Sequence, residues 1–157
     1  MKLPKAARHG LKDALRKTGL RSTRQRELIY GILMERRNHP TAEEVHAQAK
    51  ERMPGISLAT VYNGLDALVT CDLVKQVHFE RTSTRFCPNL QEHAHFQCEQ
   101  TGEVFDVPLD EKANQYLQDI LPEGYSARSI SLSYLGKSPA GDWEGRDQKT
   151  ISKAAMS

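Results

Sequence analysis

The hydrophobic pattern changes its period once along the chain, and this change constrains the fold more than any other feature. Up to residue 70, apolar residues recur at helical spacing in successive segments. From "LVKQVHF" onward the period is two, and "TRFC" follows after the short polar stretch "ERTS", which predicts a two-stranded hairpin. Helices followed by a hairpin are typical of a winged helix-turn-helix, whose last helix enters the DNA major groove while the wing touches the backbone.

Capping residues indicate where two of the helices begin. Thr41, with Glu44 three residues later, forms a capping box, so a helix is expected to start just after Pro40. Ser57 is a favourable N-cap for the next segment, "LATVYNGLDALVT". The residues expected to form its buried stripe are Leu58, Val61, Leu65 and Leu68. The opposite side is small and polar, as a surface that reads DNA should be.

Charge is distributed unevenly along the chain. Residues 1–90 contain 16 Lys or Arg and 9 Asp or Glu, whereas residues 91–157 contain 6 and 11. A basic half followed by an acidic half favours a polyanion-binding module joined to a different domain, although an uneven solvated surface is the simpler interpretation. Nine basic residues and one acid within residues 1–26 favour contacts with DNA phosphates. Winged-helix modules that dock proteins remain an alternative.

The second part of the chain differs in kind. "HAHFQCE" and "EVFDV" predict paired strands, "DEKANQYLQDIL" a short helix, and the alternating "SARSISLSYLG" a further strand. We therefore expect an α+β fold with a winged-helix domain over 1–84, a hinge over 85–92, a small α/β dimerisation domain over 93–136 and a flexible tail over 137–157. A unit of about 45 residues is too small to bury a good core alone, so a homodimer is expected.

Composition excludes several classes of protein. No stretch approaches the roughly 18 apolar residues of a membrane span, so no membrane association is expected. The three cysteines, Cys71, Cys87 and Cys98, are an odd number, which is unfavourable for a disulfide framework and favours a cytoplasmic location.

Several motifs occur together in a characteristic order. They are "GLRSTRQR", "HPTAEEV", "PGISLATVYNGLDAL", "HAHFQCEQTGEVFDV" and "SLSYLG". In this order the chain resembles the ferric-uptake-regulator (Fur) family of metal-responsive transcriptional repressors. The resemblance implies a winged helix, a hinge and a C-terminal dimerisation domain, with a homodimer that binds a palindromic operator in double-stranded DNA.

The resemblance also implies one regulatory divalent metal per subunit, either Zn²⁺, Fe²⁺ or Mn²⁺. The family pattern maps this site onto His39, Cys87, His93, His95 and Asp106. Two of these residues, His93 and His95, are two apart on a predicted strand, so their side chains point the same way and can bind one ion. Ligands from both sides of the hinge would set the conformation that binds DNA.

A second metal site of the family is expected to be absent. Members usually hold a structural zinc through two Cys-x-x-Cys pairs, which here map onto Cys98 with Thr101 and onto positions near Ser138 and Gly141. One thiolate cannot build a closed tetrahedral site, so no structural zinc held by four cysteines is expected. Cys98 is then interpreted as a small strand residue.

The subgroup within the family is left open. Cys87 replaces the Asp or Glu of iron- and peroxide-sensing relatives and suits Zn²⁺, but the additional ligand of zinc-uptake regulators would fall at about Lys75. Asn63 after "ATVY" is shared with peroxide-sensing (PerR-like) and Irr-type members, which the chain resembles most. Some Irr-type regulators respond to haem, and Cys87-Pro88 is the Cys-Pro dipeptide of haem-regulatory motifs.

Six residues are expected to contact DNA, four on the fourth helix and two near phosphates: Ser57, Thr60, Tyr62, Asn63, Arg21 and Arg24. The chain is not expected to be an enzyme. A His/Cys metalloenzyme is the alternative from another class, and it is disfavoured because the ligands would be distributed across a hinge with no base or nucleophile nearby in the sequence.

Overall fold

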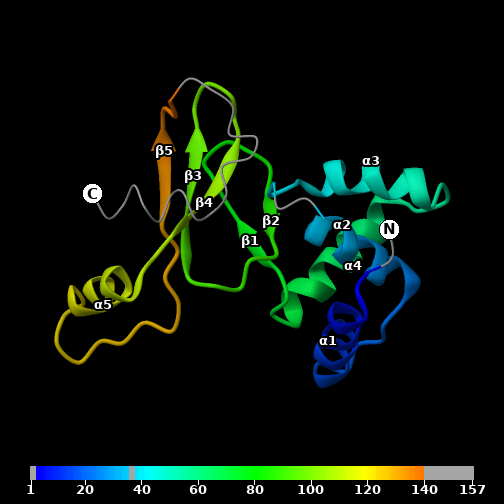
Figure 1. Cartoon of the computed structure of the whole chain (residues 1–157), viewed down its shortest axis with the longest axis horizontal. Coiled ribbons are helices and arrows are strands. Elements are labelled where there is room, and N and C mark those ends of the chain that lie inside the picture. The colour runs from blue at the N-terminus through cyan, green and yellow to red at the C-terminus, as the bar shows by residue number, and fades with distance from the viewer. Residues whose placement is uncertain (1–2, 36–37, 140–157) are drawn as a thin grey trace. The chain divides into compact units, whose positions relative to one another are not determined.

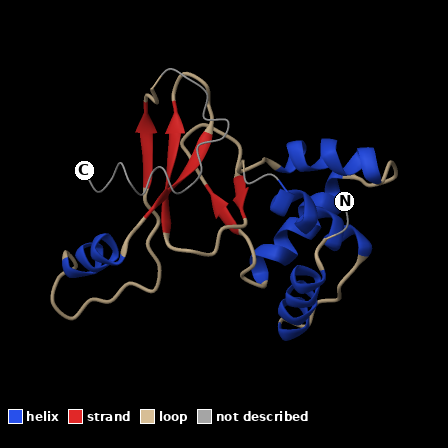
Figure 2. Ribbon diagram, in the orientation of Figure 1, coloured by secondary structure: helices blue, strands red, loops and turns tan. Residues whose placement is uncertain are grey.

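The structure is a computed structural model that describes residues 3–35 and 38–139. The chain divides into two compact units, Met1–Leu90 and Gln91–Ser157. Helices dominate the first unit and a three-stranded sheet the second (Figure 2). The predicted α+β class, a helical DNA-binding fold followed by a small α/β domain, is confirmed. The predicted domain and hinge bounds stay predictions, and residues 140–157 of the expected tail lie outside the described residues.

The first unit contains four helices and a hairpin, labelled in Figure 1. The helices are α1 (Lys5–Lys17), α2 (Arg24–Glu35), α3 (Ala42–Arg52) and α4 (Leu58–Thr70). Strands β1 (Lys75–Val77) and β2 (Arg85–Cys87) pair antiparallel, as the change of period predicted. Helix α1 buries Leu11 and Leu15.

The predicted caps fix where α3 and α4 begin. The Thr41 side chain accepts a hydrogen bond from the Glu44 backbone N–H at 3.2 Å, and the Thr41 N–H donates to the Glu44 carboxylate at 2.8 Å. The predicted capping box is therefore confirmed. The Ser57 hydroxyl accepts from the backbone N–H of Thr60 at 3.1 Å, which confirms the N-cap of α4.

The core of the first unit is formed by the apolar faces of helices α1, α2, α3 and α4. Its fully buried members on these helices include Leu11, Leu15, Ile29, Ile32, Leu33, Val61, Leu65 and Leu68. Each such side chain stabilises the fold by about 1.5–3 kcal/mol relative to leaving it in water. One residue of the predicted buried stripe of α4 differs from its prediction: Leu58 is only partly buried.

The second unit is a sheet with one helix. Its elements are β3 (His93–Cys98), β4 (Val104–Pro108), α5 (Glu111–Asp119) and β5 (Ser133–Gly136). The strand order is β4-β3-β5. Strands β3 and β4 pair antiparallel around a turn in which Gly102 has a φ of 73°, a conformation that glycine adopts without steric cost.

The last strand differs from its prediction. The alternation through "SARSISLSYLG" predicted a strand over the whole segment, but β5 comprises only Ser133–Gly136 and runs parallel to β3. Alternation indicates an extended chain without supplying a neighbour, and a strand forms only where its backbone groups find one. Here pairing with β3 starts at His95, whose N–H donates to the Leu132 carbonyl at 3.0 Å.

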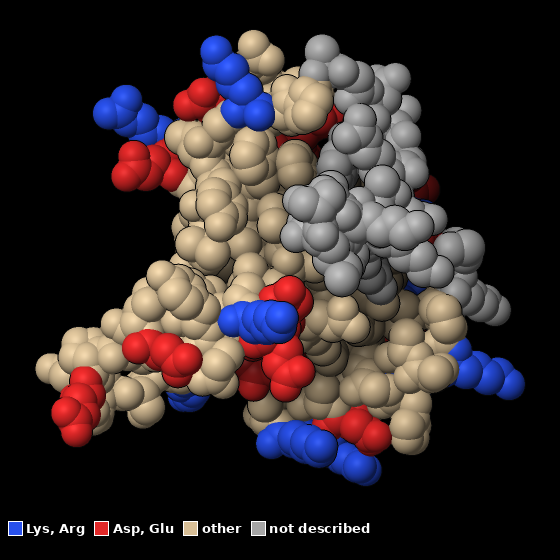
Figure 3. Space-filling model, turned by 60° about the vertical axis from the view of Figure 1, so that its left-hand side comes forward, with Lys and Arg blue, Asp and Glu red and all other residues tan. Residues whose placement is uncertain are grey.

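Helix α5 has no buried residue. Large apolar side chains are exposed on α5, on β5 and between them: Tyr116, Ile120, Tyr125, Tyr134 and Leu135. In the view of Figure 3, charged side chains lie in separate small groups and uncharged ones cover most of the surface. Exposed large apolar side chains, where they lie together, are typical of a surface that contacts a partner. Within residues 3–35 and 38–139, no helix has the length and apolar character needed to cross a membrane.

Candidate functional site

Strands β3 and β4 bring three potential metal ligands together in the second unit. His93 and His95 lie two residues apart on β3, and Asp106 of β4 is the cross-strand partner of His95. The two Nε2 atoms are 3.0 Å apart, and they lie 3.3 Å (His93) and 3.5 Å (His95) from Oδ1 of Asp106. All three side chains are buried. Two imidazole nitrogens and a carboxylate oxygen therefore converge on one point.

The backbone before β3 orients one of these rings. Nδ1 of His93 lies 2.5 Å from the carbonyl oxygen of Gln91. A carbonyl only accepts, so Nδ1 must carry the proton, and the lone pair of the neutral ring is then on Nε2, the nitrogen that faces His95 and Asp106. Fixing a ligand histidine through its other nitrogen is the usual arrangement in metal sites.

The first unit holds two further potential ligands. His39 precedes α3, and Cys87 ends β2; both are buried. A ring nitrogen of His39 and Sγ of Cys87 lie within 4.8 Å of each other. His39 has a φ of 53°, in the left-handed region that non-glycine residues seldom occupy, although histidine occurs there more often than most.

These donors fit a divalent transition metal. Imidazole, thiolate and carboxylate are the ligand types that bind Zn²⁺, and imidazole with carboxylate also suits Fe²⁺ and Mn²⁺. The residues near Cys98 do not fit a four-thiolate zinc site, because the chain has three cysteines in all. The Ser138 hydroxyl instead donates a hydrogen bond to Cys98 Sγ at 3.2 Å. The expected absence of a structural zinc held by four cysteines stays a prediction.

The Cys98 thiol is acidic for a cysteine. Hydrogen bonds from the Ser138 and Thr101 side chains favour the thiolate and lower the pKa of Cys98 from 9.0 to about 6. Since this pKa is depressed in the folded protein, the thiolate stabilises the fold fully above pH 9, and the contribution is lost as pH falls through 6.

Ser138→Ala is expected to raise the pKa of Cys98 toward its ordinary value, because the strongest of these hydrogen bonds is removed. The ultraviolet absorbance of the thiolate, followed as a function of pH, measures this shift. Cys98→Ser serves as the control and should abolish the titration step assigned to this residue. A step that stays near pH 6 in Ser138→Ala would contradict this role for the serine.

The predicted DNA-contacting residues lie on or near α4 and at the start of α2. Tyr62, Asn63, Arg21 and Arg24 are exposed. The Ser57 and Thr60 hydroxyls lie 2.8 Å apart, and Ser57 also caps the helix. These two hydroxyls therefore have partners within the start of the helix. That these residues contact DNA stays a prediction.

Two residues with contacts at these sites were absent from the sequence prediction. Glu43 of α3 accepts a hydrogen bond from the Tyr62 hydroxyl at 2.8 Å. The pKa of Glu43 is lowered mainly by a hydrogen bond with the backbone and secondly by this contact with Tyr62. Arg85 of β2 donates to the His39 carbonyl at 3.0 Å. Neither contact has a local sequence signal, because each joins residues that are far apart along the chain.

Comparison with known proteins gives consistent results. Residues 17–135 match the sequence model of the ferric uptake regulator family. The peroxide-responsive repressor PerR of Staphylococcus epidermidis is 38% identical over 109 residues, which are 68% of this chain and 73% of that protein.

Solved structures give the same result for the fold. The ferric uptake regulator of Pseudomonas aeruginosa with manganese has a TM-score of 0.68 at 28% identity, and the match covers 80% of this chain and 96% of that one. The Helicobacter pylori ferric uptake regulator has a TM-score of 0.73 and covers 88% of this chain and 94% of its own. At 18% identity, the latter supports the fold alone.

Proposed function

Because the chain belongs to the ferric uptake regulator family, we propose that it is a metal-responsive transcriptional repressor that binds a palindromic operator as a homodimer. The observation that carries the proposal is the buried group of His93, His95 and Asp106, whose ligand atoms lie within 3.5 Å of one another. Two imidazole nitrogens and a carboxylate oxygen are donor types that bind a divalent cation.

One divalent ion per subunit would be held by these three residues together with His39 and Cys87 of the first unit. The ion would supply a positive charge that draws ligands from both units to one point. Since the ligands come from both sides of the expected hinge, their affinity for the ion depends on the angle between the units. Metal binding would then favour the angle at which the two α4 helices of the homodimer, one from each subunit, reach successive major grooves of DNA.

Regulation of peroxide stress or metal homeostasis genes is the physiological role that we propose. Identity of 38% to a peroxide-responsive repressor supports the first of these. A role as a zinc-uptake-type or haem-responsive regulator is the alternative, and Cys87 is the residue that favours it. The exposed apolar side chains of α5 and β5 support a homodimer. We propose that the protein acts as a regulator rather than as an enzyme.

Operator binding tests the proposal. Fluorescence anisotropy with an operator fragment and with random DNA should give metal-dependent binding that a chelator removes. Asn63→Ala should reduce the discrimination between the two DNAs by about 1–3 kcal/mol, because asparagine can make paired contacts to an adenine edge. Arg21→Ala should weaken binding to both DNAs and flatten its salt dependence, because it removes a phosphate contact. Unchanged sequence preference in Asn63→Ala would put the reading surface elsewhere.

A further inference from the structure

The chain before α3 lies alongside strand β2 of the β1–β2 hairpin, which is the predicted wing. The Pro40 carbonyl accepts a hydrogen bond from the N–H of Phe86 at 3.0 Å, and Thr41 forms an isolated antiparallel bridge with Arg85. This pairing extends the two-stranded β1–β2 hairpin by a short third segment. It also brings His39, at the end of that segment, next to the strand that ends in Cys87.

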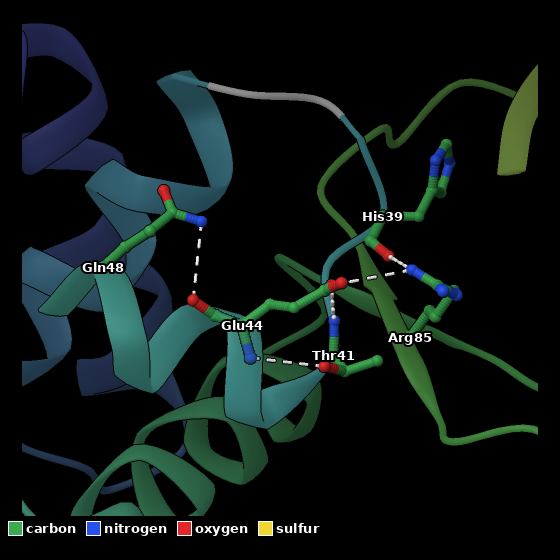
Figure 4. Close-up of polar contacts among 5 residues, drawn as sticks. All are labelled: His39, Thr41, Glu44, Gln48 and Arg85. Carbon is green, nitrogen blue, oxygen red and sulfur yellow. Dashed lines mark hydrogen bonds and ion pairs between the residues drawn. The ribbon is translucent and has the colours of Figure 1, made fainter. Parts of the chain in front are cut away.

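The Arg85 side chain connects this segment to the start of α3. Its Nη1 donates to the His39 carbonyl at 3.0 Å and lies 3.6 Å from Oε2 of Glu44 (Figure 4). The same Glu44 oxygen accepts from the Thr41 N–H at 2.8 Å and so completes the capping box. One guanidinium therefore joins the backbone of His39, the N-terminus of α3 and strand β2. A charged donor forms stronger hydrogen bonds than a neutral one.

Two features of His39 make such a contact consequential. Its φ of 53° lies in a region that persists only where the surroundings hold it. Its carbonyl fixes the following peptide plane, and with it the direction in which the Cα–Cβ bond of His39 points. Cys87 is two residues after Arg85 on the same strand, so one anchor serves both potential ligands of the first unit.

We propose that Arg85 is a positioning residue that holds His39 ready to bind metal before any metal arrives. The inference rests on the proposed function, in which His39 is a ligand. Arg85 itself binds no metal, since guanidinium has no lone pair to offer. Its effect is to hold the site close to the geometry that binds metal, so that less conformational freedom is lost when the ion binds.

The test compares metal affinity among variants of the full chain, measured by Zn²⁺ competition against a chromophoric chelator. Arg85→Ala is expected to weaken binding by about 10–100-fold, the range found when partners of metal ligands are removed. Arg85→Lys should restore part of the loss, because an ammonium group can donate to the carbonyl. Glu44→Gln keeps the capping box, since glutamine also serves at this position, and should cause a smaller loss than Arg85→Ala.

Arg52→Gln is the matched control. It removes the ion pair of Arg52 with Glu35, whose contacts of 2.7 and 3.1 Å join α3 to α2 within the same unit. This variant should lose thermal stability without losing metal affinity. The metal-free protein supplies a second readout: backbone amide signals of His39 and Thr41 in NMR spectra should shift in Arg85→Ala and stay in place in Arg52→Gln.

Two outcomes overturn the inference. Wild-type affinity in Arg85→Ala would do so, and so would an equal loss of affinity in Arg52→Gln, because the effect would then follow stability alone. His39→Ala distinguishes this failure from failure of the proposed function. If His39→Ala binds metal normally, the proposed metal centre is wrong and the role of Arg85 falls with it. If His39→Ala loses affinity and Arg85→Ala does not, only the positioning role is wrong.

Discussion

Cys87→Ser is expected to lower the affinity of the protein for Zn²⁺ by about a hundredfold or more. Loss of a residue that only supports a ligand costs about 10–100-fold, and loss of a thiolate ligand should cost at least the upper end of that range. Thiolate is also the donor that most favours Zn²⁺ over harder ions. Competition against a chelator measures the loss, and Cys71→Ser, which changes a buried cysteine of the helical core, is the matched control.

Spectroscopy and pH dependence make this prediction specific to the thiolate. Bound Co²⁺ should show a sulfur-to-metal charge-transfer band that Cys87→Ser abolishes and Cys71→Ser keeps. Because a thiol must lose its proton to bind, metal uptake should release a proton and weaken as pH falls. Cys87→Asp should shift preference from Zn²⁺ toward Fe²⁺ or Mn²⁺.

A Co²⁺ complex without this band, together with normal affinity in Cys87→Ser, would contradict the prediction. His39, His93, His95 and Asp106 would then be the whole ligand set. These three imidazoles and one carboxylate, without a thiolate, are the donors expected of an iron- or manganese-type sensor.

Leu65→Ala is expected to lower the free energy of unfolding of the first unit by about 2–5 kcal/mol. Leu65 lies in the middle of α4 and is fully buried in the core of the first unit, so its loss leaves a cavity beneath the helix that is proposed to read DNA. Urea denaturation followed by circular dichroism measures the change. Affinity for the operator should fall as well once an appreciable fraction of the unit is unfolded.

Asp66→Ala is the control for this substitution, because Asp66 is the next residue of the same helix and is exposed. Its stability should stay within about 0.5 kcal/mol of the wild type. Equal losses in Leu65→Ala and Asp66→Ala would contradict the prediction, because burial of the leucine side chain would then not determine the stability of α4.

Local chemistry predicted the parts of the fold that depend on neighbours in sequence. The starts of α3 and α4 follow from Thr41, Glu44 and Ser57, since capping is decided within three residues. Likewise, the proximity of His93 to His95 follows from the period of a strand. Contacts between distant segments were not predictable in this way.

The parallel pairing of β5 with β3 is one such contact, because it depends on the route of the chain after α5. The anchoring of His39 by Arg85 is another, since the two residues are brought together only when the wing lies along the start of α3. The resemblance to a family located His39 as a potential ligand but said nothing about what holds it. Sequence patterns thus pointed to residues with potential ligand atoms, whereas the contacts that hold these residues are found only in the structure.

The bridge between Thr41 and Arg85 has a mechanical consequence. The chain leaves this point into α3, continues through α4 and β1, and returns to the same point on β2, so this stretch forms a closed ring of linked segments. Because this stretch is joined at both of its ends, a displacement at His39 or Cys87 would be passed on to α4 through the segments of the ring. If metal binding changes the angle between the units, as we propose, we expect the rotation to fall in residues 88–92, after Cys87, and not within the β1–β2 hairpin.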